Sequence, residues 1–449
     1  MALLTKAPRG TSDILPESAA LYRFLEDRFI ETATAYGFRE IRTPVFEHTE
    51  LFNRSVGETT DVVQKEMYTF EDNGQRSITL RPEGTAGVAR AFLEHGLFNE
   101  PMPQKYFYHT SCYRYEKPQA GRLREFHQFG VECMGSPSPA ADAEIISLAR
   151  HVFDFFELDG ISLEINSIGC PVCRREYHKA LLAYFESKKD ELCETCQSRL
   201  YRNPMRILDC KSPVCAAIAK DAPVVLDFLC EECADHFKAV QKYLDAMDID
   251  YQINPRIVRG LDYYTKTVFE FVSTAIGAQG TVCGGGRYDG LIEQLGGAPL
   301  PASGFGMGIE RLLLLLNARH RDLPEEPRIQ LYIAPAAPEY GVEAMRMVND
   351  LREEGVSALT DLENRSVKAQ MKYANKKNAM FTMILGPDEI ESRRATVKNM
   401  DNGETTEVSL DTFSEDFMHV TINAALADID LGADGIDPNN LTLLTGGKD

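Results

Sequence analysis

The first helix of the chain is predicted by the spacing of its apolar side chains. These side chains recur every three or four residues between a proline and a glycine, which is typical of an amphipathic helix. They are Leu21, Leu25, Phe29, Ala33 and Tyr36. The pattern predicts a helix over residues 17–36, followed by a short extended segment over 38–44.

A long β-hairpin is predicted further along the chain. Residues 105–116 and 125–134 are rich in aromatic and β-branched side chains, and the loop 117–124 between them contains a proline and a glycine. The loop carries Lys117, Arg122 and Arg124 but no acidic residue. It is either a solvated turn or a contact for phosphate groups.

The hairpin has one predominantly polar face. Because the side chains of a strand alternate between its two faces, Arg114 and Glu116 share one face of the outgoing strand. Phe126, Gln128 and Glu132 share one face of the returning strand. If the two faces coincide, this side of the hairpin is the floor of a site for a charged, ring-bearing ligand. The alternative is a solvated outer face of the sheet.

The pattern of predicted strands and helices changes at a polar linker over residues 320–327. Before the linker, strands are predicted at 163–168, 257–259 and 267–272, and an apolar helix ends near residue 317. After it, strand and helix patterns alternate at 329–334, 339–354, 356–359, 366–377 and 379–385. The alternation predicts a small α/β domain with a mixed or parallel sheet. The acidic tail from residue 428 is predicted to be disordered.

Composition restricts the classes of protein to which the chain can belong. Its 449 residues suffice for roughly two to four domains, and 44% of them are hydrophobic, as in ordinary globular proteins. A formal net charge of −20 argues against nonspecific coating of nucleic acid. Because we find neither a secretion signal nor a run of about 18 apolar residues, we expect a cytoplasmic protein that binds no membrane.

Most of the 11 cysteines form closely spaced pairs. The pairs are Cys170 and Cys173, Cys193 and Cys196, Cys210 and Cys215, and Cys230 and Cys233. Without a secretion signal, this spacing favours structural Zn²⁺ in one or two sites of four thiolates over a disulfide framework. Buried reduced thiols are the alternative, and the pairing of the ligands stays open. The unpaired Cys112, Cys133 and Cys283 are predicted to be packing residues.

Three segments resemble the motifs of class II aminoacyl-tRNA synthetases. The sequence FYHTSCYRYE at 107–116, the basic loop and REFHQF at 124–129 resemble motif 2. The sequence GFGMGIER at 304–311 resembles motif 3. The helix and extended segment that end at Pro44 resemble motif 1, which forms the dimer interface in that class. The resemblance therefore implies a homodimer.

Four further segments are similar to sequences of the histidine–tRNA ligase family within that class. They are RGTSD at 9–13, LRPEGT at 80–85, RGLDYY at 259–264 and GGRYDG at 285–290. The resemblance covers roughly residues 5–420, and motifs this long in this order are not expected by chance.

The resemblance implies an α+β fold of several parts. A class II antiparallel β-sheet catalytic core, flanked by helices, is expected over 1–165 and 252–325. An inserted, mainly helical and cysteine-rich domain is expected over 166–251, and an α/β anticodon-binding domain over 328–424. The acidic tail occupies 425–449.

The implied activity is ATP-dependent ligation of L-histidine to tRNA(His) through a histidyl-adenylate, with release of AMP and diphosphate and with Mg²⁺ present. Arg259 and Arg114 are the implied catalytic residues, because guanidinium groups stabilise charge that builds at the α-phosphate. The residues implied for histidine are Glu83, Gly84, Thr85, Arg114, Gln128, Glu132, Arg259, Tyr263 and Tyr264. Those implied for ATP are Arg114, Glu116, Arg122, Phe126 and Arg311.

Two regions are implied to contact tRNA. Gln119 and Arg124 of the basic loop correspond to residues that read the extra 5′ guanosine of this tRNA. In the C-terminal domain the candidates are Lys368, Lys372, Lys376 and Lys377, for which a solvated helix face is the alternative.

Two related groups share parts of this pattern. The regulatory subunit of ATP phosphoribosyltransferase shares the fold but typically lacks the anticodon-binding domain and the ATP-binding arginines. Ligases for threonine, proline or glycine share motifs 1 to 3 but not the segments at Arg259 and Gly285. Because Arg114, Arg259 and Arg311 are all present, we expect a catalytic member of the histidine–tRNA ligase family.

Overall fold

The computed structural model divides into two compact units, Met1–Glu325 and Glu326–Asp449, which we describe one at a time. The structure describes residues 4–57, 60, 62–158, 160–208, 210, 212–257, 259, 261–275, 280–318 and 327–427. Apart from Pro327, the linker predicted at 320–327 and the tail predicted from residue 428 lie outside the described residues.

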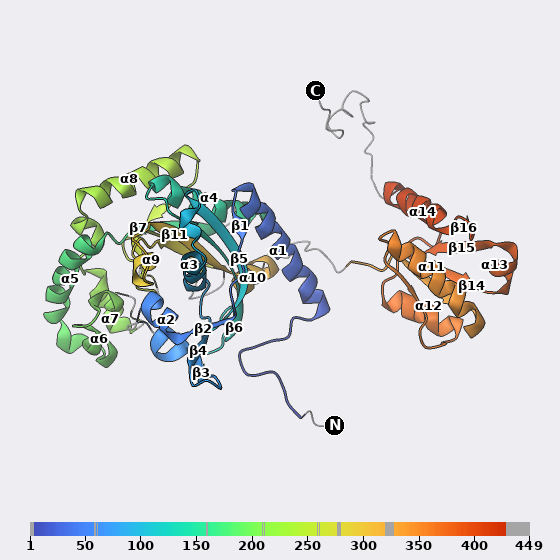
Figure 1. Ribbon diagram of the computed structural model, residues 1–449, viewed down its shortest axis with the longest axis horizontal. Helices are drawn as coiled ribbons and strands as arrows, with labels where there is room; N and C mark the ends of the chain where they lie inside the picture. Colours follow the sequence, from blue (N-terminus) through green and yellow to red (C-terminus); the bar gives the residue numbers. More distant parts are fainter. Residues whose placement is uncertain are drawn as a thin grey trace. The chain divides into compact units, whose positions relative to one another are not determined.

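The first unit is built on an eight-stranded sheet in the order β1-β5-β6-β11-β10-β9-β7-β8 (Figure 1). Its strands are β1 Arg39–Glu40, β5 Gln104–Tyr113, β6 Glu125–Met134, β7 Ile161–Ser167, β8 Gln252–Ile253, β9 Thr265–Ser273, β10 Thr281–Arg287 and β11 Ala302–Gly308. Neighbouring strands are antiparallel, except for the parallel pairs β1–β5 and β7–β8 at the two edges. The predicted α+β class with an antiparallel core is confirmed.

One face of this sheet packs against helices α1 Pro16–Ala35, α4 Pro139–Phe155, α8 Glu231–Ala246 and α10 Ile309–Ala318. The predicted first helix is confirmed as α1, and its Leu25 and Phe29 belong to the same buried cluster as Phe129 of β6 and Phe305 of β11. Because side chains alternate along a strand, the residues beside Phe129 and Phe305 point to the opposite face. This alternation leaves the opposite face free for polar side chains.

The opposite face carries a three-stranded sheet and short helices. The sheet has the order β2-β4-β3, with β2 Phe46–His48, β3 Tyr68–Glu71 and β4 Ser77–Leu80. The helices are α2 Thr49–Val56, α3 Thr85–Glu94 and α9 Leu291–Gln294. Phe92 of α3 packs in one buried cluster with Tyr108, Tyr264 and Tyr288, so aromatic rings cover this side of the large sheet.

A group of helices is inserted between β7 and β8 (Figure 1). It comprises α5 Pro171–Glu186, α6 Glu194–Arg199, α7 Pro213–Lys220 and α8. Tyr177, Leu181, Phe185 and Ile207 belong to a buried cluster of its own. Short 3₁₀ or π-helical turns lie at Val62–Glu66, Leu97–Asn99, Lys189–Glu191, Pro204–Ile207, Val225–Phe228 and Pro338–Tyr340.

The second unit is a five-stranded mixed sheet in the order β13-β12-β14-β15-β16. Its strands are β12 Leu331–Pro335, β13 Ala358–Thr360, β14 Phe381–Leu385, β15 Arg394–Asn399 and β16 Thr405–Ser409. Its helices are α11 Gly341–Glu353, α12 Val367–Lys376, α13 Pro387–Ser392 and α14 Phe413–Ala427. The predicted alternation from β12 to β14 is confirmed. The sequence pattern missed the final hairpin because only Ala395 and Val397 of β15 and Val408 of β16 are buried between polar positions.

Two strand predictions were wrong. The strand predicted over 105–116 ends at Tyr113, because the chain leaves the sheet there to form the basic loop, so Arg114 and Glu116 lie in that loop. Of the strand predicted at 257–259, the described residues Ile257 and Arg259 belong to no strand, because the chain pairs with β7 earlier, at β8. Ile257 is apolar because it is buried in a core cluster, not because it belongs to a strand. No helix among the described residues combines the length and apolar character needed to cross a bilayer.

Candidate active site

A cavity of about 290 Å³ opens on the polar face of the large sheet. Most of the residues predicted to bind histidine or ATP line it together: Glu83, Thr85, Arg114, Glu116, Arg122, Phe126, Gln128, Arg259, Tyr263, Tyr264 and Arg311. They come from the start of α3 and the segment just before it, from α10, from β6 and the loop that precedes it, and from the segment before β9. The cavity therefore collects residues that are separated by more than two hundred positions in the chain.

Four of the predicted residues do not line the cavity: Gly84, Gln119, Arg124 and Glu132. Gly84 precedes α3, and a side chain at this position would overlap the ring of Tyr108. Gln119 exchanges backbone hydrogen bonds of 3.0 and 2.9 Å with Arg122 in the turn of the basic loop. The guanidinium of Arg124 lies 3.8 Å from the ring centre of Tyr115. Gln119 and Arg124 therefore lie in the loop rather than in the cavity.

Guanidinium groups crowd one part of the cavity. Arg114 donates from Nε to the carbonyl of Pro82 at 2.8 Å, and its guanidinium lies 5.4 Å from the ring centre of Phe126. Arg311 donates to the carbonyl of Gly121 at 3.2 Å. Burial lowers the pKa of Arg311, and repulsion from Arg122 and Arg114 lowers it further. Cations held this close together favour binding of a polyanion.

Arg259 is held by a carboxylate that the sequence patterns did not single out. Its guanidinium forms an ion pair with Glu270 of β9, and Glu270 also accepts a hydrogen bond of 2.8 Å from Thr281. Burial alone would lower the pKa of Arg259, but its neighbours Tyr264 and Glu270 raise it above its usual value. A side chain at Gly284 would overlap the guanidinium, so the glycine makes room for it. Arg259 is therefore a fixed, permanently charged group.

Glu83 lies at the start of α3. Its carboxylate accepts hydrogen bonds from the backbone N–H groups of Thr85, at 2.7 Å, and Ala86, at 2.8 Å. Burial raises the pKa of Glu83, while these N–H groups and Arg114 act in the opposite direction. The arrangement presents a shielded carboxylate to the cavity, which suits a small cationic group such as an ammonium.

Glu132 is fully buried behind the cavity and bonded to two tyrosines. Tyr108 donates to its Oε1 at 3.0 Å, and Tyr288 donates to its Oε2. Burial raises the pKa of Glu132 to about 8. The predicted contact of Glu132 with an imidazole thus stays a prediction. The sequence patterns indicated no role for the two tyrosines, although Tyr108 shares strand parity with Arg114 and Tyr288 lies within GGRYDG.

The glycines of motif 3 are required by the polar side chains of the neighbouring strand. Gly304 pairs with Glu132 and Gly306 with Gly130 between β11 and β6. A side chain at Gly304 would overlap the Glu132 carboxylate, and one at Gly306 would overlap the Gln128 amide. The alternate glycines of GFGMGIER therefore leave space for side chains over the sheet.

Arg287 fixes the end of β10, next to Tyr288. Its guanidinium is completely buried and pairs with Asp142 of α4 at 2.6 Å. It also donates to the carbonyls of Ser136 and Ser138, at 2.8 and 3.0 Å. Because the ion pair joins β10 to α4, it holds the strand end in the position from which Tyr288 reaches Glu132.

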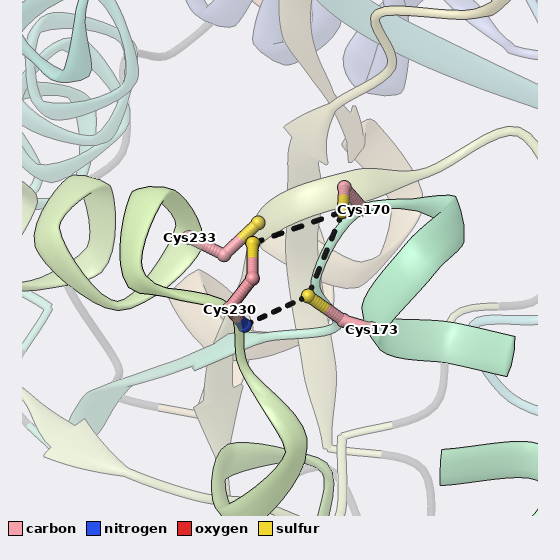
Figure 2. Close-up of side chains that lie close together, drawn as sticks. All are labelled: Cys170, Cys173, Cys230 and Cys233. Atoms are coloured by element: carbon pink, nitrogen blue, oxygen red, sulfur yellow. Dashed lines mark hydrogen bonds between the residues drawn. The ribbon is translucent and has the colours of Figure 1, made fainter. Parts of the chain in front are cut away.

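The paired cysteines form two groups of four in the helical insertion. Cys170, Cys173, Cys230 and Cys233 form one group (Figure 2), and Cys193, Cys196, Cys210 and Cys215 form the other. Within each group the sulfur atoms all lie within 4.8 Å of one another. The sulfur–sulfur separations are 3.6 Å for Cys170 and Cys173, 4.0 Å for Cys170 and Cys230, and 3.8 Å for Cys193 and Cys210. The grouping therefore joins the first pair with the last, and the second with the third.

Helix starts hold these thiols. Cys173, Cys196, Cys215 and Cys233 are each the third residue of a helix. Within each group a backbone N–H donates to a sulfur of another pair. Cys230 donates to Cys173 Sγ at 3.1 Å, and Cys193 donates to Cys215 Sγ at 3.2 Å. The N–H groups of a helix start stabilise thiolates. Hydrogen bonds from the Cys196 amide lower the pKa of Cys193 to about 7.

The comparisons with known proteins agree along nearly the whole chain. Residues 10–312 match the family model of histidyl-tRNA synthetase, and residues 330–417 match that of an anticodon binding domain. The chain is 55% identical over 410 residues to the histidine–tRNA ligase of Clostridium novyi (strain NT), which covers 91% of this chain and 98% of that protein. It is 54% identical over 410 residues to that of Acetivibrio thermocellus, with the same coverage.

A solved structure shows the same likeness. The structure of apo histidyl-tRNA synthetase from S. aureus is 41% identical and covers 92% of this chain and 100% of that one, with a TM-score of 0.79. The family model spans more than half of the chain, and the relatives extend over both of its units. The chain therefore belongs to the histidyl-tRNA synthetase family.

Proposed function

We propose that this chain joins L-histidine to tRNA(His) at the expense of ATP, through a histidyl-adenylate, with release of diphosphate and then AMP. The observation that carries the proposal is one cavity in which Arg114, Arg259 and Arg311 lie together with the Glu83 carboxylate. The cations suit a triphosphate and the carboxylate suits the α-ammonium of an amino acid. The family and the similar ligases support the same activity.

In the first step, a carboxylate oxygen of histidine attacks the α-phosphorus of ATP, and the bond to the diphosphate breaks. Arg114 and Arg259 hold the oxygens on which charge builds, because both groups remain charged and in place throughout the step. Arg311 and Phe126 flank the adenine, and Arg122 contacts the phosphates. Glu116, a buried carboxylate in this part of the wall, would hold Mg²⁺ carried with ATP, and the ion would supply further positive charge to the phosphates.

Histidine is held at both ends. Glu83, Thr85 and Gln128 bind its α-ammonium, and Tyr264 and Glu132 bind its imidazole. Tyr263 belongs to the wall, and Gly84 lets the ring of Tyr108 approach. Buried partners of the imidazole would be left unpaired by another amino acid, which supports discrimination of about 10⁴ or more without an editing site.

In the second step, a hydroxyl of the terminal tRNA ribose attacks the adenylate carbonyl, so that an ester forms and AMP leaves. Gln119 and Arg124 contact the extra 5′ guanosine from the basic loop, where Gln119 is exposed. The C-terminal unit matches an anticodon-binding domain. Its exposed lysines Lys368, Lys372, Lys376 and Lys377 on or beside α12 are the proposed contacts there.

We also infer a cytoplasmic homodimer that binds no membrane. The exposed apolar side chains of Val45 and Phe46 follow the motif 1 segment and support an interface there. The proposed domains keep the expected bounds, with the catalytic core at 1–165 and 252–325, the insertion at 166–251 and the anticodon-binding domain at 328–424.

The test of this function is ATP–pyrophosphate exchange measured with each proteinogenic amino acid in turn. We expect exchange with histidine and, at most, trace exchange with the others, because only an imidazole satisfies the buried carboxyl and phenol groups. Exchange that depends on threonine, proline or glycine, or no exchange with histidine, would refute the proposal. Charging of tRNA(His) by the same preparation tests the second step.

We infer further that each cysteine group holds one structural Zn²⁺. Four thiolates at about 2.3 Å from a tetrahedral Zn²⁺ lie about 3.8 Å apart, and the sulfur–sulfur separations given above run from 3.6 to 4.0 Å. The ion of the first group would crosslink α5 to α8. The ion of the second group would crosslink α6 to Cys210 and the start of α7.

Elemental analysis is expected to find about two zinc ions per chain. Cys173→Ser and Cys196→Ser should each lose one ion, because each removes a buried ligand of a different group. Cys283→Ala is the matched control, since Cys283 is buried but belongs to neither group, and it should keep both ions. Freshly purified protein without metal, or equal zinc loss in the control, would reject the inference.

A further inference from the structure

A second cavity, of about 400 Å³, adjoins the candidate active site. Arg259 and Leu261 belong to the walls of both cavities. The rest of the second wall comes mainly from the first turns of α5 and from the turn at Pro204–Ile207. This cavity therefore lies between the helical insertion and the residue proposed to act at the α-phosphate.

The second cavity is strongly cationic. Its wall contains Arg174, Arg175, Arg202, Arg206 and His178 besides Arg259. The one carboxylate among its described wall residues is Asp262, to which Arg206 donates at 3.1 Å. Within the described part of the chain, no ion pair is formed by Arg174, Arg175 or Arg202. This excess of positive charge stands out in a chain of net charge −20.

Buried residues hold the two backbone segments that carry these arginines. Arg174 and Arg175 directly follow Cys173, which belongs to the first cysteine group at the start of α5. Arg202 and Arg206 flank a turn in which Pro204 and Ile207 are buried. The guanidinium groups are thus presented from two fixed backbone segments, as expected of a site for phosphate oxygens.

We propose that the second cavity binds backbone phosphates of the unpaired 3′ strand of the tRNA. This inference rests on the proposed function, in which a ribose at the end of that strand must reach the adenylate beside Arg259. A single strand carries one negative charge per nucleotide, so a cationic pocket that opens next to Arg259 holds the strand as it enters. Free diphosphate is the other phosphate source for such a pocket, and the experiment distinguishes the two.

The experiment compares Arg175→Ala/Arg202→Ala with the wild-type enzyme. Both side chains are exposed and form no ion pair with any described residue, so the fold should tolerate their removal. We expect histidine-dependent pyrophosphate exchange to stay within about twofold, and transfer of histidine to tRNA to fall about tenfold for each lost contact. The slope of log affinity for tRNA against log salt should become shallower by about 1.4, which corresponds to two single-stranded phosphate contacts.

A matched variant and a truncated tRNA complete the test. Lys238→Ala/Lys242→Ala removes two exposed cations of α8 that do not line the cavity, and it should transfer histidine normally. The wild-type enzyme should bind tRNA that lacks its unpaired 3′ nucleotides more weakly than it binds full-length tRNA. The arginine substitutions should cause no further loss of affinity for this truncated tRNA. Additive losses would place the arginines elsewhere on the tRNA and overturn the inference.

Two other outcomes also decide the question. Equal losses in exchange and transfer would assign the pocket to diphosphate, and normal transfer with an unchanged salt slope would leave it no role in tRNA binding. Either result overturns this inference while the proposed function stands. If the wild-type enzyme itself failed to charge tRNA(His), the proposed function would fail instead.

Discussion

Arg259→Ala is expected to lower histidine-dependent pyrophosphate exchange by about a hundredfold to a thousandfold, the usual cost of removing one preorganised donor from a developing negative charge. The guanidinium is held by Glu270 and accommodated by Gly284, so no other side chain can take its place. Because the group is already charged and held in position by Glu270, the loss should appear mainly in kcat. Steady-state exchange at saturating histidine and ATP measures it.

A second substitution separates the catalytic effect from an effect on folding. Arg259→Ala leaves Glu270 without its cation in a largely buried position, which destabilises the fold. Arg259→Ala/Glu270→Gln removes both charges and should recover thermal stability without recovering exchange. If the double variant recovered activity together with stability, Arg259 would be structural. Near-normal exchange in the single variant would also contradict its proposed role.

Above pH 8, where the Glu132 carboxyl is ionised, Glu132→Gln is expected to reduce kcat/KM for histidine by about 10³-fold or more, because the site would then lose the acceptor that distinguishes an imidazole. In the native protein the carboxyl receives hydrogen bonds from Tyr108 and Tyr288. An amide in its place turns one acceptor into a donor that faces a phenol or the ring N–H. Exchange measured over a range of histidine concentrations tests this effect.

The same variant should change the pH dependence of stability. Burial raises the pKa of Glu132 from 4.5 to about 8. A raised carboxyl pKa means that the protonated form is favoured by folding, so this contribution to stability is complete below pH 4.5 and is lost as the pH rises through about 8. Relative to the wild type, Glu132→Gln should therefore become more stable as the pH rises across this window. Thermal unfolding of both proteins at several pH values measures the difference.

Glu125→Gln is the matched control. Glu125 lies on the same strand and also accepts a hydrogen bond from a tyrosine, Tyr113, at 3.0 Å. Unlike Glu132, which is completely buried, Glu125 is only half-buried. Its substitution should leave histidine activation and the pH profile of stability close to those of the wild type. A control that behaved like Glu132→Gln would show that any carboxyl on β6 has this effect.

Local patterns in the sequence were sufficient for features that depend on neighbouring residues. The alternation over 125–134 predicted β6 with the observed bounds, and the spacing of apolar residues predicted α1 to within one residue at each end. The same parity placed Gln128 on the polar face that lines the cavity. Such patterns succeed because burial repeats with the period of the strand or helix itself.

Long-range features required the folded chain. The spacing of the cysteines left their pairing open, and the packing of α5 beside the start of α8 joins Cys170 and Cys173 with Cys230 and Cys233. Glu270, Tyr108 and Tyr288 meet their partners through strand register and helix packing, which no local periodicity reports. The same is true of the second cavity, whose arginines lie about thirty residues apart on two segments of the insertion. Residue types and their periodicity thus determine the elements and their faces, whereas the packing of distant segments determines which side chains share a site.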